Sequence, residues 1–120
     1  MTLRLADCWV WDSWYVEDAG VHHAFYLKAS RALGDPERRH RHVVVGHAVS
    51  DDLRTWEELP DALTPSEPEA FDDWTTWTGS IVRDGARWRM FYTGSSRSDD
   101  GLVQRIGSAT SSDLLTWVKE

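Results

Sequence analysis

An acidic residue stands among tryptophans near the start of the chain, in the stretch VWDSW at residues 10–14. Trp9, Trp11 and Trp14 surround Asp12 in the sequence. On a regular strand alternate side chains share a face, so Trp14 lies on the face of Asp12 and Trp11 on the opposite face. Two readings follow: Asp12 is a surface residue with bulky neighbours, or the indoles form a pocket around a working acid. Trp11 joins such a pocket only if the strand bulges or ends there.

Other chemistries find less support in the residues. The basic run at 38–42, RRHRH, could bind phosphate or nucleic acid, but a net charge of −7 and a pI of about 5.1 favour a solvated loop. The five His and the single Cys8 show no spacing typical of a zinc site. There is no glycine-rich phosphate loop and no Ser-His-Asp signature. We therefore expect no metal, no cofactor and no nucleic-acid partner.

The composition is that of one ordinary globular domain. The chain has 120 residues, of which 41% are hydrophobic and eight are Trp. No apolar run approaches a membrane span or the core of a signal peptide, and charged residues begin at Arg4. A single Cys cannot form an internal disulfide. We expect no membrane partner and a cytoplasmic location.

An internal repeat organises the sequence. GHAVSDDLRTW at 46–56 and GSATSSDLLTW at 107–117 superimpose without a gap, 61 residues apart. Upstream, HAFYLKAS at 23–30 matches RMFYTGSS at 89–96, and the Trp-led stretch from Trp11 matches the one from Trp77. The two copies therefore share one order of elements.

The segments of each copy have the residues of strands. They are short, β-branched or aromatic, and bounded by turn residues such as Asp84-Gly85. Four antiparallel strands per copy predict one propeller blade, with the first blade at 1–60 and the second at 61–120 of a single partial propeller domain. Residues 30–41 and 60–74 are predicted to be loops. A repeat of this length does not fit a WD40 or kelch blade.

Two blades cannot close a ring, because propellers typically have about 4–8. The blade faces would carry exposed apolar surface in an isolated chain. We therefore expect as partners either the remaining blades of a propeller or further copies of this chain.

Three stretches carry a family resemblance. VWDSW resembles the first-blade motif of levansucrases, WTGSIVRDGARWRMFYTG at 77–94 resembles the second-blade stretch of levansucrases and invertases, and QRIGSATSSDLLTW at 104–117 resembles the end of that blade. In order and spacing the whole chain resembles glycoside hydrolase family 32. The resemblance implies an all-β, five-bladed β-propeller fold, of which this chain covers about two four-stranded antiparallel blades.

The resemblance also implies an active site. Asp12 stands at the position of the family nucleophile, which attacks the anomeric carbon of a β-fructoside in a retaining mechanism. Trp11, Trp14, Trp77 and Thr78 would help to shape the sugar pocket, with the Thr78 hydroxyl beside the nucleophile where the family usually has Ser. The expected partner is therefore a carbohydrate substrate, a fructoside.

The family has two further carboxylates, an Asp in an Arg-Asp-Pro motif and a Glu acid/base, and neither motif occurs here. Arg83-Asp84-Gly85 is instead the hairpin turn of the second copy. By itself the chain is therefore expected to be catalytically incomplete. Two alternatives stay open: an inverting arabinosidase- or xylosidase-like hydrolase, and a non-catalytic carbohydrate-binding or self-associating propeller piece.

Overall fold

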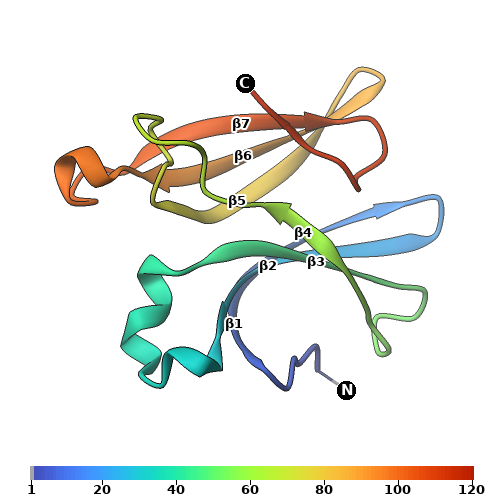
Figure 1. Cartoon of the computed structure of the whole chain (residues 1–120). Coiled ribbons are helices and arrows are strands. Elements are labelled where there is room, and N and C mark those ends of the chain that lie inside the picture. The colour runs from blue at the N-terminus through green and yellow to red at the C-terminus, as the bar shows by residue number, and fades with distance from the viewer. Residues whose placement is uncertain (1) are drawn as a thin grey trace.

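The computed structural model describes residues 2–120 and consists of two four-stranded antiparallel sheets (Figure 1). The strands of each sheet follow one another in chain order, so that every connection joins neighbours. This confirms the fold class expected from the repeat. The first sheet comprises β1 (Cys8–Asp18), β2 (Val21–Ser30), β3 (Val44–Ser50) and β4 (Glu57–Leu63), and the second comprises β5 (Thr75–Asp84), β6 (Arg87–Ser95), β7 (Arg105–Ser111) and β8 (Val118–Lys119).

The turns between the strands explain the repeated sequence. Ser50 accepts hydrogen bonds from the backbone of Asp52 and Leu53, and Asp52 accepts from the next two backbone amides. Ser111 and Asp113 make the same bonds in the second sheet. These side chains replace hydrogen bonds that the chain loses where it reverses. Asp52 and Asp113 each cap the turn in which they lie.

The segment after β2 is more regular than expected. It contains two 3-10 helices, η1 (Arg31–Leu33) and η2 (Pro36–Arg41), where the sequence predicted a loop. Asp35 caps η2 by accepting from the Glu37 amide, and Pro36 supplies a helical φ in the first turn. A third such helix, η3 (Arg97–Asp99), follows β6. β4 also extends to Leu63, into the second predicted loop.

The main core lies between the two sheets, which pack face to face (Figure 1). Aromatic side chains cross this interface: the ring of Trp117 meets Phe25 edge-on, with centroids 5.7 Å apart. Burying these side chains is what holds the two sheets in a fixed relation. The buried members are Trp14, Phe25, Leu27, Val43, Val45 and Leu63 from the first half and Met90, Tyr92, Ala109 and Leu114 from the second.

The outer faces of the sheets carry less cover. Phe91 and Ile106, which point away from the first sheet, are 42% and 70% exposed. Tyr15, on the outer face of the first sheet, is 56% exposed. No helix within residues 2–120 is long and apolar enough to span a membrane.

Candidate active site

Asp12 is the extra residue of a β-bulge in β1. Trp11 pairs with Leu27 and Ser13 with Tyr26, so Asp12 has no partner on β2. The bulge breaks the alternation that a regular strand would have. Trp11 and Trp14 consequently share the face of β1 that packs toward the second sheet, instead of lying on opposite faces. The expectation from regular pleating is wrong here, because one unpaired residue shifts every side chain beyond it.

β5 contains the same feature at the equivalent place. Trp77 pairs with Thr93 and Gly79 with Tyr92, which leaves Thr78 as the unpaired residue. Gly79 permits this geometry, because a Cβ at that position would collide with the backbone carbonyl oxygen of Phe91. Each sheet therefore presents one bulged side chain from its first strand.

The two bulged residues meet across the sheets. The Thr78 hydroxyl donates a hydrogen bond to Asp12 Oδ2 over 2.7 Å. Both residues are exposed to the cleft described below. The bond orients the carboxylate and leaves Oδ1 free of protein donors within the described residues.

These side chains line a cleft of about 480 Å³ between the sheets. Four of the five site residues predicted from the sequence meet there. Thr93 and Gln104 add polar groups from the second sheet, and Leu27 adds an apolar patch. The complete lining is Trp11, Asp12, Leu27, Arg39, His40, Trp77, Thr78, Thr93 and Gln104.

Trp14 is not among the residues of the cleft. Its side chain is 8% exposed and stacks on Phe25 in the core, with ring centroids 6.5 Å apart. Trp14 is thus a core residue that packs β1 against β2. Its predicted contact with substrate has no counterpart in this geometry.

The sequence reading missed Arg39 and His40. Both come from η2, and the His40 ring meets Trp11 edge-on with centroids 6.0 Å apart. The Arg39 guanidinium lies 5.3 Å from the Trp11 ring centroid, and the His40 carbonyl accepts from Trp77 Nε1 over 3.0 Å. From the sequence, the basic run at 38–42 is predicted to be a solvated loop. Its place directly after β2 is the signal that could have found these residues, because the end of β2 pairs with the part of β1 just before Asp12.

A larger hollow of about 830 Å³ lies on the outer side of β1. Asp12 also borders it, but the other lining residues are mostly apolar, including Leu3, Val10 and Trp56. The polar groups converge in the smaller cleft, so we assign the chemistry there. Among residues 2–120 no group of three or more His, Cys, Asp or Glu side chains is placed to hold a metal ion.

Comparison with known proteins shows the family of the chain. Residues 14–120 match the model of the glycosyl hydrolases family 32 N-terminal domain. The chain belongs to this family. The matched range includes Trp14, Trp77 and Thr78, while Trp11 and Asp12 lie just before it.

Relatives of the family 32 chain include plant, fungal and insect proteins. Beta-fructofuranosidase 1 of Zea mays is 44% identical over 79 residues, which are 62% of this chain and 11% of the maize protein. The crystal structure of fructan 1-exohydrolase IIa from Cichorium intybus has a TM-score of 0.74 at 27% identity, over 98% of this chain and 22% of that one. A fructofuranosidase variant from Schwanniomyces occidentalis complexed with fructosylnystose has a TM-score of 0.74 at 22% identity, over 98% and 24% of the respective chains.

The likeness to these structures fixes the architecture. The two sheets are two blades of a five-bladed β-propeller fold. The chain spans about a tenth of the maize relative and about a fifth of the chicory enzyme.

Proposed function

We propose that the protein carrying this chain is a glycosidase that acts on β-fructosides by a retaining mechanism, with Asp12 as the nucleophile. The contact between Asp12 and Thr78 is the observation that supports this most directly. It holds one carboxylate at the junction of two blades, in a cleft walled by the indoles of Trp11 and Trp77.

The free carboxylate oxygen suits nucleophilic attack. Asp12 Oδ1 would form a bond to the anomeric carbon of the fructosyl unit, while the bond from that carbon to the leaving oxygen breaks. The leaving oxygen takes a proton from a carboxylic acid, and water then cleaves the fructosyl-enzyme ester. The Thr78 hydroxyl keeps Asp12 in one orientation through this cycle, so that less freedom is lost on reaching the transition state.

The proton donor is not among the residues that line the cleft. Asp12 is the sole carboxylate there within residues 2–120. A retaining pair stands about 5–5.5 Å apart. We propose that the acid comes from a residue that does not line this cleft in the described part of the chain.

The indoles account for binding of a neutral sugar. Trp11 and Trp77 offer flat apolar surfaces that match the C–H faces of a sugar ring. The Trp11 N–H can bond at the edge, while the Trp77 N–H is already bonded to the His40 carbonyl. Arg39 and His40 supply side-chain donors beside them. Hydrogen-bonding groups set in an aromatic frame are typical of small-ligand sites.

The first prediction tests the nucleophile. Asp12→Asn keeps the size of the side chain but removes the charge that attacks carbon, so turnover of sucrose by the full-length protein should fall by about 10³-fold or more. Binding of sucrose should change much less, because Trp11, Trp77 and Thr78 remain. Steady-state kinetics and calorimetric titration measure the two quantities.

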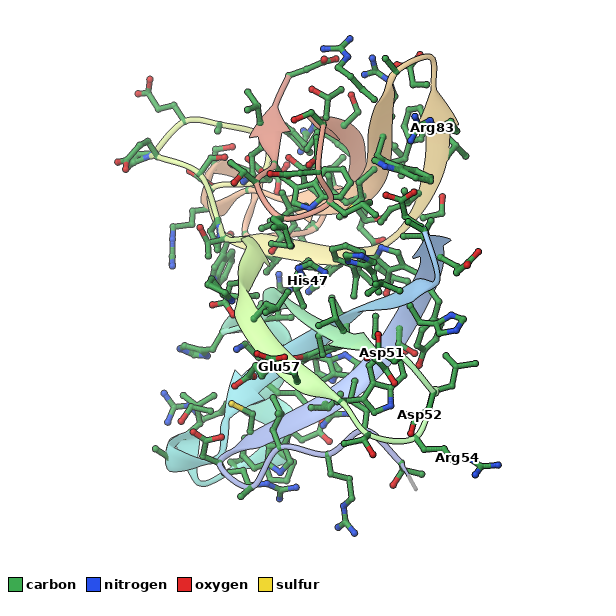
Figure 2. All side chains as sticks on the ribbon, turned by 90° about the vertical axis from the view of Figure 1, so that its right-hand side faces the viewer. His47, Asp51, Asp52, Arg54, Glu57 and Arg83 are labelled. Atoms are coloured by element: carbon green, nitrogen blue, oxygen red, sulfur yellow. The ribbon has the colours of Figure 1, made fainter. Side chains whose placement is uncertain are left out.

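Asp52→Asn is the matched control. Asp52 lies in the turn between β3 and β4, at the outer edge of the first sheet (Figure 2). Its replacement should leave kcat within about twofold of the parent and lower the stability only slightly. Hydrolysis by Asp12→Asn at the parent rate would show that Asp12 is not the nucleophile.

A binding module is the second candidate function, favoured by the single carboxylate of the cleft. In that case the full-length protein would bind sucrose or a fructan in titration and release no fructose. Turnover of either sugar excludes it.

A further inference from the structure

The η2 segment links the two blades. η2 and the 97–101 turn lie at one end of the molecule, opposite the β1–β2 and β5–β6 hairpins (Figure 1). Arg41, the last residue of η2, reaches from the first half of the chain into the second. Its guanidinium carbon lies 4.6 Å from the ring centroid of Trp74 and 5.7 Å from that of Trp77. The Arg97 guanidinium lies 4.9 Å from the Trp74 ring, so cations and indoles alternate here.

Packing, and not charge pairing, fixes the Arg41 side chain. Within residues 2–120 it forms no ion pair, and its buried Nη1 has no hydrogen-bond partner. Gly101 lies directly against the guanidinium, because a Cβ at that position would collide with Nη1. A cation over the face of an indole is attracted by the ring, and the attraction grows as water is excluded. The contact thus joins η2 to the start of the second blade.

The residues next to Arg41 form one wall of the cleft. Arg39 rests on the Trp11 ring, and the His40 carbonyl accepts from Trp77 Nε1 over 3.0 Å. η2 is six residues long and is capped at its other end by Asp35. Arg39 and His40 therefore have little freedom once Arg41 is held.

We propose that Arg41 is a positioning residue: held between Trp74 and Trp77, it keeps Arg39 and His40 against the cleft, where they bind the hydroxyls of the sugar opposite Asp12. This rests on the proposed function. Arg41 itself does not line the cleft, so its effect on the substrate passes through its neighbours.

Steady-state kinetics of the full-length protein on sucrose test the proposal. Arg41→Ala should raise KM about tenfold and leave kcat within twofold, because Asp12 and Thr78 are untouched. Arg41→Lys, which keeps a cation above the indoles, should recover a KM within about threefold of the parent. Arg38→Ala is the control, because Arg38 is exposed on the same segment and, within residues 2–120, its side chain bonds only the Leu33 carbonyl.

A double-mutant cycle separates positioning from general damage. If Arg41 acts through its neighbour, Arg41→Ala should add less than a twofold rise in KM in an Arg39→Ala background. The indole N–H signal of Trp77 should shift in Arg41→Ala, since its bond to His40 loosens. If Arg41→Ala fails to fold, the same measurements are made on Arg41→Gln.

The outcomes that overturn the proposal are distinct. An unchanged KM in Arg41→Ala, a fall in kcat alone, or independent effects of Arg39 and Arg41 would each refute it while the proposed function stands. No turnover and no binding of sucrose by the parent would refute the proposed function and this proposal with it.

Discussion

At the scale of single residues, the site depends on two unpaired positions that the repeat aligns with each other. The stretches led by Trp11 and Trp77 correspond in the two blades, so Asp12 and Thr78 occupy equivalent places. Each is the bulged residue of its strand, and the bulges turn both side chains into the same cleft. One blade thus supplies the carboxylate and the next supplies its hydrogen-bond donor.

The Thr78 hydroxyl should matter for rate more than for binding. Thr78→Val removes the donor to Asp12 while keeping nearly the same shape. A hydrogen bond to a charged group is worth about 1.5–3 kcal/mol, which corresponds to a fall in kcat of about 10- to 100-fold. Thr78→Ser, which keeps the hydroxyl, should stay within about threefold of the parent. Equal kcat values in Thr78→Val and Thr78→Ser would show that the bond is incidental.

At the scale of elements, the strands and turns could be predicted because the information is local. The repeated Ser-x-Asp-Leu stretch specifies its own turn through side-chain bonds to the nearest amides. The bulges at Asp12 and Thr78 could not be predicted, because pairing register depends on the partner strand. The position of η2 over the cleft depends on contacts between Arg41 and residues more than 30 positions away, which the local sequence does not encode.

A histidine pair on neighbouring strands makes the interface between the blades sensitive to acid. His23 Nδ1 and His47 Nε2 lie 2.9 Å apart, and Figure 2 shows His47 between the two sheets. Burial, followed by the neighbouring His23, lowers the pKa of His47 to about 4. Burial also lowers the pKa of His23, while the charge of Asp18 opposes that shift.

Stability should therefore fall as the pH falls from about 6.5 to about 4. In this window the unfolded chain binds a proton that folded His47 does not accept, so protons favour unfolding. Between pH 7 and pH 5 the loss should be about 2 kcal/mol for His47 alone. Carboxyl groups with a lowered pKa, such as Asp72, affect the stability only at lower pH than this comparison between pH 7 and pH 5. Urea unfolding of the parent and of His47→Gln at the two pH values measures it, and an equally steep dependence in the variant would contradict this origin.

At the scale of the whole molecule, the two blades cover one face of each other and leave the outer faces open. On the second sheet Val82, Phe91, Ile106 and Val118 share the face that points away from the first. Arg89 stands among them in ion pairs with Asp84 and Glu120. A face of apolar side chains around one charge network is typical of a surface that another protein element covers.

The 120-residue chain expressed alone should associate through this face. Ile106 is 70% exposed and Phe91 42%, and removing such side chains from water favours contact between copies. Phe91→Lys combined with Ile106→Lys should shift the chain toward a monomer in light scattering coupled to size-exclusion chromatography. Leu102→Lys is the control, because Leu102 is 82% exposed but lies in the connection between β6 and β7, off the sheet face. A parent chain that is a monomer and melts cooperatively would contradict this prediction. It would show that two blades form a stable unit without association through the outer face.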